Sequence, residues 1–299
     1  MKEINLKSYG KINLSLDVTG VRDDGYHSLE SVMQRISLFD RIKITWDPSD
    51  DSQVSIKVET NKPYLPTDER NLAYKAAQIM AEHYGEKVGG GLVSINITKN
   101  LPVAAGLAGG SGNGAAVLIG LNKLWDLKLS TKTLCRVGEL LGSDVPFCVL
   151  VQNTHYDASL AEGRGEILTP IKKPMKKHLV LAKPAFGVST KEVYQGIDNY
   201  EIISRPDSQA LIEALKNKDY DLVYKNMVNV LELYTLDNYE PVAELKKLFE
   251  EKTAAEMVLM SGSGPTVFAV YDSEIAARKA CEILRKMRYE AYWANTMSR

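Results

Sequence analysis

The sequence lacks long apolar runs, a surplus of charge of either sign, and more than a few cysteines. Its 299 residues include 37 basic and 38 acidic ones, so no global field favours nucleic acid or an anionic membrane surface. No stretch approaches the roughly 20 apolar residues of a membrane span, and the first residues lack the apolar core of a secretory signal. We therefore expect a cytoplasmic protein with no nucleic-acid or membrane partner.

The three cysteines are odd in number and lie far apart in apolar stretches: Cys135, Cys148 and Cys281. Such a set does not form a disulfide framework. It is typical of reduced thiols in the core of a cytosolic protein.

The chain is long enough for two domains or for one large α/β unit. Alternating apolar residues predict strands at residues 12–18, 41–45, 54–58 and 92–98. Helical spacing predicts helices at residues 71–84, with Gly85 as a stop, and from residue 112 to 125. Ser130 is placed to cap a further helix ending near Gly142, and residues 142–146 read as a turn.

The second half of the chain starts a new unit between residues 150 and 175. The pattern predicts strands at 178–183, 257–260, 267–271 and 289–294, and helices at 208–215, 221–231, 241–251 and 274–288. We therefore expect an α+β fold with domains at residues 1–160 and 161–299.

Five glycines fall within residues 106–114, directly ahead of an apolar helix. Glycine lets backbone N–H groups approach a ligand closely, and a helix N-terminus favours phosphate. The segment therefore predicts an anion cradle. It is not a Walker A loop, because no Gly-Lys-Ser or Gly-Lys-Thr follows. The alternative is an ordinary flexible connection between a strand and a helix.

A second Ser/Gly loop, residues 261–266, lies between two apolar strands. Alone it is equally well a tight hairpin, but two such loops suggest a shared cleft for a polyanion. Lys11 precedes a strand and Asp144 lies in a turn. An Asp–Lys pair can orient a hydroxyl and take its proton, while both residues also suit surface or capping positions.

In this order the segments resemble the GHMP kinase superfamily almost from end to end. The motifs that carry the resemblance are residues 11–16, 24–29, 70–73, 101–111, 142–147, 163–166 and 260–266. The resemblance implies two lobes, an N-terminal one like ribosomal protein S5 domain 2 and a ferredoxin-like C-terminal one. The Gly25-Tyr26-His27 box, together with the Lys11-Ile12-Asn13 start, is more specific. It implies the branch of the superfamily that acts on a cytidine diphosphate-linked methylerythritol.

The resemblance also implies a reaction and its residues. The γ-phosphoryl group of ATP would pass, with Mg²⁺, to the 2-hydroxyl of that acceptor, a step of non-mevalonate isoprenoid synthesis. Asp144 would be the catalytic base and Lys11 its partner. The residues implied for ATP are Pro102, Ala104, Ala105, Gly106, Leu107, Ala108, Gly109, Gly110, Ser111, Gly112, Asn71 and Lys99. Ser111 would also bind the metal.

For the acceptor, the matching positions are Asn13, Tyr26, His27, Thr190, Tyr194, Gly262, Ser263 and Gly264. An aromatic ring can stack on cytosine while an imidazole or its backbone addresses the polar edge of the base. Without the resemblance, Tyr26 reads as a turn aromatic and His27 as a solvated histidine. We expect a small-molecule partner and a monomer or homodimer.

The sequence departs from the family pattern in two segments. Residues 112–114 read Gly-Asn-Gly where the family commonly has a second serine, and residues 151–160 replace a paired-glycine segment. The first change predicts a more flexible cradle, with weaker ATP binding or slower turnover. The second would narrow the acceptor pocket, change the acceptor, or bulge into solvent. Two alternatives therefore stay open: a GHMP-type kinase for another small alcohol, or a weakly active nucleotide-binding homologue.

Overall fold

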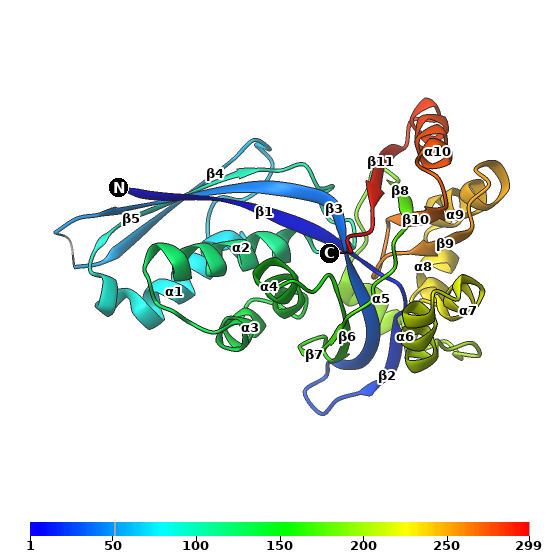
Figure 1. Ribbon diagram of the computed structural model, residues 1–299, viewed down its shortest axis with the longest axis horizontal. Coiled ribbons are helices and arrows are strands. Elements are labelled where there is room, and N and C mark those ends of the chain that lie inside the picture. Colours follow the sequence, from blue (N-terminus) through cyan, green and yellow to red (C-terminus); the bar gives the residue numbers. More distant parts are fainter. Residues whose placement is uncertain (51, 299) are drawn as a thin grey trace. The chain divides into compact units, whose positions relative to one another are not determined.

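The computed structural model describes residues 1–50 and 52–298 (Figure 1). The chain forms two compact units, described here one at a time. Unit 1 contains Met1–Gly10, Leu38–Pro102 and Ala108–His155, and unit 2 contains Lys11–Ser37, Val103–Leu107 and Tyr156–Arg299. The predicted boundary near residue 160 stays a prediction, because these units follow packing in space and not the order of the chain.

Unit 1 is built on a sheet from β1 (Lys2–Asn13), β3 (His27–Pro48), β4 (Val54–Thr60) and β5 (Gly91–Thr98). Strand β5 pairs antiparallel with the end of β3 and parallel with β4. Alternate residues of β3 and β5 are buried on one face: Ile42, Ile44, Trp46, Val93, Ile95 and Ile97. The strands predicted at 41–45, 54–58 and 92–98 are confirmed, and β3 is much longer than predicted.

The helices of unit 1 are α1 (Leu72–Val88), α2 (Gly109–Leu124), α3 (Thr131–Glu139) and α4 (Val145–Asn153). In Figure 1, α1 and α2 pack together along the sheet of this unit. Gly85 does not stop α1, so that prediction is wrong. Gly89, with a φ of 77°, occupies the left-handed position instead and donates its N–H to the carbonyl oxygen of Gly85. Ser130 caps α3 as predicted, although that helix ends at Glu139.

In unit 2, the first part of β3 pairs with β2 (Asp17–Val21) and with β6 (Ala158–Gly163), which pairs with β7 (Ile167–Ile171). Gly25, at a φ of 78°, forms the turn between β2 and β3. The fully buried guanidinium of Arg35 forms an ion pair with Asp157, at the start of β6. Neither β6 nor β7 was predicted from the sequence.

The second sheet of unit 2 contains β8 (His178–Lys183), β9 (Met257–Met260), β10 (Val267–Tyr271) and β11 (Glu290–Asn295), in the order β11-β8-β10-β9 with antiparallel neighbours. Helices lie between β8 and β9 and between β10 and β11 along the chain. This order confirms the expected ferredoxin-like arrangement. Helices α9 (Glu240–Lys252) and α10 (Glu274–Lys286) pack against this sheet.

The remaining helices are α5 (Thr190–Ile197), α6 (Ser208–Asn217), α7 (Tyr220–Asn226) and α8 (Glu232–Asn238). Two predictions here are wrong for one reason. Leu16 exchanges backbone hydrogen bonds with Val228 and Val230, at 2.9 Å each. This bridge interrupts the strand predicted at 12–18, and it holds the chain extended where a helix to residue 231 was predicted.

The three cysteines are free; Cys148 and Cys281 are buried, as predicted, whereas Cys135 is half-buried and does not lie in the core. Within residues 1–50 and 52–298, no helix is both long and apolar enough to cross a membrane.

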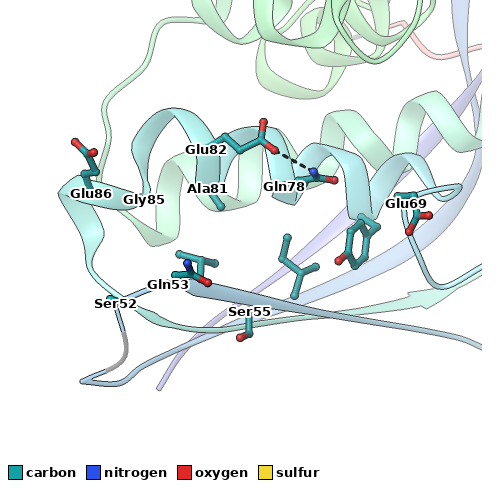
Figure 2. A pocket seen from close by; sticks show the side chains of 12 residues that line it. Ser52, Gln53, Ser55, Glu69, Gln78, Ala81, Glu82, Gly85 and Glu86 are labelled. Carbon is teal, nitrogen blue, oxygen red and sulfur yellow. Dashed lines mark hydrogen bonds between the residues drawn. The ribbon is translucent and has the colours of Figure 1, made fainter.

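A pocket of about 830 Å³ lies in unit 1 between α1 and the edge strand β4 (Figure 2). Its lining includes the carboxylates of Glu69, Glu82 and Glu86, and Gln78 donates a hydrogen bond to Glu82 at 2.9 Å. None of the residues predicted for the site lines this pocket. Because its charged lining is acidic, it does not suit a polyphosphate, and we do not place the candidate site there.

Candidate functional site

The predicted phosphate-binding loop alternates between two backbone conformations. Ala104, Gly106 and Ala108 have φ angles of 50°, 68° and 54°, whereas the residues between them do not have positive φ. Left-handed conformations are uncommon for alanine and are often found at ligand sites. Alternation of this kind turns successive N–H groups into a concavity that binds anions. The local backbone therefore suits the predicted cradle.

Helix α2 begins at Gly109, three residues earlier than predicted. Gly110 and Ser111 therefore lie in its first turn and not in a loop. The first N–H groups of an α-helix have no partner within the helix, and Ala108, the residue before α2, offers them no side-chain cap. These N–H groups and the helix dipole favour an anion at this end.

Lys99 lies beside the start of α2. A Cβ atom added to Gly109 would be 2.7 Å from the Nζ of Lys99. This ammonium donates to Oδ2 of Asp40 at 2.5 Å, and both side chains are buried. The other oxygen of Asp40 accepts from the N–H groups of Asn100 and Leu101, at 2.7 and 2.8 Å. Sequence reasoning missed Asp40, which no motif marks, yet it fixes the lysine and the entry to the loop.

The side chain of Asn113, in the second turn of α2, contacts the carboxylate of Asp40 as well. In the orientation that matches donors to acceptors, its amide nitrogen lies 2.9 Å from Oδ2 of Asp40, 3.1 Å from the carbonyl oxygen of Gly109 and 2.8 Å from Oγ of Ser8. The side chain is buried. The start of α2 is thus fixed by polar contacts from inside.

Gly112 is needed for close packing. A Cβ atom at this position would lie 2.7 Å from Oγ of Ser8 and 3.2 Å from the carbonyl oxygen of Tyr9. Gln152 donates from Nε2 to the carbonyl oxygen of Gly112 at 3.3 Å. A side chain at residue 112 would require the Ser8 hydroxyl to move. The greater flexibility expected from these glycines stays a prediction. The two segments that depart from the family pattern touch each other at this point.

Residues 151–160 do not form a bulging loop. Helix α4 extends to Asn153, and strand β6 begins at Ala158. Between them, His155 is exposed and Asp157 forms the buried pair with Arg35. The segment is therefore built into two regular elements.

Asp144 lies directly before α4 and is half-buried. Its side chain makes no capping hydrogen bond, although it occupies the cap position. Asn71, by contrast, is committed to α1: its Oδ1 accepts from Ala73 N–H at 3.0 Å, and its Nδ2 donates to the carbonyl oxygen of Pro66 at 2.7 Å. The adenosine contact predicted for Asn71 stays a prediction.

Lys11 begins a chain of buried hydrogen bonds in unit 2. Its Nζ donates to Oδ1 of Asn13 at 2.7 Å, Nδ2 of Asn13 donates to Oγ of Ser31 at 2.8 Å, and that hydroxyl donates to the carbonyl oxygen of Ser15 at 2.6 Å. Such bonds offset part of the cost of burying an ammonium group. Ser31 was missed from the sequence. The pairing of Lys11 with Asp144 stays a prediction.

The two glycine segments meet inside unit 2. Ser261 donates from Oγ to the carbonyl oxygen of Gly106 at 3.0 Å, and a Cβ atom on Gly262 would lie 3.3 Å from the same oxygen. The N–H of Lys11 donates to the carbonyl oxygen of Leu107 at 3.1 Å. The structure thus brings residues 103–107, the second glycine loop and Lys11 together.

The positions implied for the acceptor also gather in unit 2. Thr190 and Ser263 share a hydrogen bond between their hydroxyls at 2.9 Å. The rings of His27 and Tyr194 lie 5.4 Å apart between centroids, with planes inclined at 42°. Tyr26, beside His27, is 58% exposed. Segments distant in the sequence therefore supply polar and aromatic groups to one unit.

The Asp40–Lys99 pair gives a first prediction. The change Asp40→Asn leaves the ammonium of Lys99 buried without its counter-charge, so the free energy of unfolding in urea should fall by about 3–5 kcal/mol. The matched control is Glu59→Gln, because Glu59 pairs with Lys57 at 2.8 Å on the exposed surface and should contribute little. Equal stability of Asp40→Asn and the wild type would contradict the role given to Asp40.

Known proteins resemble the chain over its whole length. The pattern of the GHMP kinases N terminal domain matches residues 71–152, and that of the GHMP kinases C terminal domain matches residues 211–290. A 4-diphosphocytidyl-2-C-methyl-D-erythritol kinase of Clostridium perfringens is 46% identical over 297 residues, which is 99% of each chain.

Solved structures give the same result. A crystal structure of 4-(cytidine 5'-diphospho)-2C-methyl-D-erythritol kinase matches with a TM-score of 0.81 and 29% identity, over 99% of this chain and 100% of the other. A homoserine kinase from Cytophaga hutchinsonii matches with a TM-score of 0.74 over 100% of this chain and 95% of the other. At 20% identity it supports the fold alone. With both domains matched and a full-length relative at this identity, the chain belongs to the GHMP kinase family of ATP-dependent kinases.

Proposed function

We propose that this chain transfers the γ-phosphoryl group of ATP to the 2-hydroxyl of 4-diphosphocytidyl-2-C-methyl-D-erythritol, a step of the non-mevalonate route to isopentenyl diphosphate. The observation that carries the proposal is the full-length similarity to a kinase of that name. The gathering of Asn13, His27, Thr190, Tyr194 and Ser263 in one unit supports it.

ATP binds with its phosphates at the start of α2. The N–H groups of the first turn and the concave backbone of residues 104–108 favour negative charge there, and Lys99, paired with Asp40, lies beside them. During transfer, these groups act on the phosphoryl group mainly by positioning it and by stabilising its charge.

Mg²⁺ accompanies ATP, with the hydroxyl of Ser111 as a protein ligand. Among the described residues, no group of three or more His, Cys, Asp or Glu side chains could hold a metal ion. Mg²⁺ usually binds through phosphate oxygens, waters and only one or two protein groups, so the chain does not need such a cluster. When bound, the ion neutralises charge on the phosphates.

Asp144 is the base that accepts the proton of the acceptor hydroxyl, and Lys11 stabilises the carboxylate and the attacking oxygen. The Asp144 carboxylate is not used to cap α4, and Lys11 is held in one position by Asn13. The contact with Asn13 suits a lysine whose role depends on fixed geometry. A cytoplasmic location and the oligomeric state stay predictions.

A panel of acceptors tests the proposal. The purified protein is incubated with magnesium-ATP and, separately, with the cytidyl-erythritol compound, mevalonate, homoserine or galactose. ADP release that depends only on the cytidyl compound is expected. Release with another acceptor would favour a diverged kinase, and none with any acceptor would favour a nucleotide-binding homologue without this activity.

The Tyr26 ring gives a second prediction. It is exposed in the turn between β2 and β3, with the guanidinium carbon of Arg164 5.3 Å from the ring centroid. Base stacking on an aromatic ring contributes about 1–3 kcal/mol, so Tyr26→Ala should raise the KM for the acceptor about tenfold and leave kcat nearly unchanged.

Tyr64→Ala is the matched control, because Tyr64 is 69% exposed and is not among the positions implied for the acceptor. Its KM should equal that of the wild type. An unchanged KM for Tyr26→Ala would contradict the proposal that the Tyr26 ring stacks on the base of the acceptor.

A further inference from the structure

His27 is held by a residue that no motif marked. Its Nε2 lies 2.8 Å from Oδ1 of Asp198, which is 171 positions away in the sequence and directly follows α5. The side chain of His27 is only 8% exposed, whereas that of Asp198 is 46% exposed. The imidazole is thus enclosed and the carboxylate reaches it from one side.

This contact decides which ring nitrogen carries the proton. An ionised carboxylate can only accept hydrogen bonds, so Nε2 of His27 must be the donor. In a neutral imidazole, the other nitrogen then accepts. Among the described residues, Asp198 is the one that bonds to this ring. Nδ1 is therefore left as an acceptor for a ligand.

The segment that carries Asp198 is itself fixed. Oε1 of Glu192 accepts from the hydroxyls of Tyr239 and Tyr234, at 2.6 and 3.1 Å. Gly196 lies against the Tyr234 ring so closely that a Cβ atom there would be 2.0 Å from Cε2. These contacts hold α5 at both ends. The backbone that carries the Asp198 carboxylate is thus positioned by packing contacts of α5.

We infer that Asp198 is a positioning residue that determines base specificity: it holds the His27 imidazole in the tautomer whose Nδ1 accepts, and so selects cytosine over uracil. Cytosine carries an amino group, a donor, where uracil carries a carbonyl oxygen, an acceptor. An accepting Nδ1 forms a hydrogen bond with the amino group of cytosine and repels the carbonyl oxygen of uracil. The inference rests on the proposed function, because it takes the acceptor to be a cytidine compound read by His27.

The tautomer can be measured without substrate. In protein labelled with ¹⁵N-histidine, long-range ¹H–¹⁵N spectra at pH 8.5 distinguish the two neutral forms. The chain has only four histidines, so the signals of His27 can be assigned from their loss in His27→Gln. We expect the Nε2–H form in the wild type and a shift towards the Nδ1–H form in Asp198→Asn, whose amide can donate to Nε2. The Nδ1–H form in the wild type, or no change in the variant, would overturn the inference.

Binding of CDP and UDP tests specificity without turnover. The wild type should bind CDP about tenfold more tightly than UDP, because a repelled carbonyl loses one hydrogen bond. Asp198→Asn should abolish most of that preference. Asp237→Asn is the matched control: Asp237 is also exposed and accepts from the Tyr200 hydroxyl at 2.6 Å, so it should keep the preference.

The two claims fail separately. Equal binding of CDP and UDP by the wild type, or a preference unchanged in Asp198→Asn, would overturn the inference even if the kinase activity is found. A preference for CDP that depends on Asp198, in a protein that phosphorylates no cytidyl compound, would sustain the inference and overturn the proposed function.

Discussion

The change Asp144→Asn should reduce phosphoryl transfer by about 10²–10⁴-fold or more, because asparagine has nearly the same shape but cannot take the proton of the hydroxyl. Stability should fall far less than turnover, because asparagine keeps the size and shape of the aspartate side chain. ATP affinity should be kept, because the proposed phosphate site consists of backbone groups of residues 104–111 and does not include Asp144. The measurements are kcat from ADP release and the ATP dissociation constant from calorimetry.

Asp126→Asn is the matched control for this variant. Asp126 is 76% exposed in the same unit, and asparagine tolerates its left-handed φ of 51°. Its turnover should equal that of the wild type. Turnover of Asp144→Asn at the wild-type rate would refute the assignment of the base, and a lost ATP affinity would point to a structural role instead.

The second large effect is expected at Gly106. An alanine there would place its Cβ atom 2.2 Å from the carbonyl oxygen of Ser261, at a φ of 68° that alanine adopts with strain. Left-handed strain and overpacking together should lower the free energy of unfolding by roughly 2–5 kcal/mol. ATP affinity should fall as well, because the backbone of residues 104–108 must shift.

Gly85→Ala provides the comparison for Gly106→Ala. It adds a Cβ atom inside α1 that would meet nothing closer than 3.8 Å, so it should stabilise the protein by about 0.5–1 kcal/mol. The measurements are the free energy of unfolding in urea and the affinity for ATP of both variants. If Gly106→Ala were as stable as the wild type and bound ATP equally well, the contact between the two glycine segments would not matter.

Regular periodicity and strong turn residues made part of the fold predictable. The β8 strand matches its predicted limits of 178–183, and Ser130 caps α3 because a serine side chain satisfies an N–H group of the first turn. Prediction from local sequence patterns failed where contacts between distant segments determine the backbone conformation. The backbone bridge between Leu16 and residues 228–230 interrupts both a predicted strand and a predicted helix. No residue near Leu16 in the sequence indicates that this bridge forms.

The site was predictable only where motifs mark it. The glycine segments stand out by composition, and they contact each other through Gly106 and Ser261. That they bind one polyanion together stays a prediction. Asp40, Ser31 and Asp198 carry no such mark, because each acts by holding another side chain in place. Partners of that kind depend on tertiary packing and become visible only in the structure.

The two departures from the family pattern lose most of their weight as arguments for another activity. Gly112 packs so closely against Ser8 that a side chain there would displace the Ser8 hydroxyl, and Gln152 from the altered segment donates a hydrogen bond to the Gly112 carbonyl oxygen. The changes therefore accommodate each other within unit 1. They give no observation that favours a different acceptor.

The most direct test of the proposed reaction is the proton-coupled ³¹P NMR spectrum of the product formed from magnesium-ATP and 4-diphosphocytidyl-2-C-methyl-D-erythritol. The 2-carbon of the acceptor bears no hydrogen, so a phosphate on its oxygen should give a new phosphomonoester singlet, with one ADP released per acceptor and the cytidine diphosphate intact. A doublet or triplet would place the phosphate on another hydroxyl. Either pattern, or ADP release without any new phosphomonoester, would contradict the proposed function.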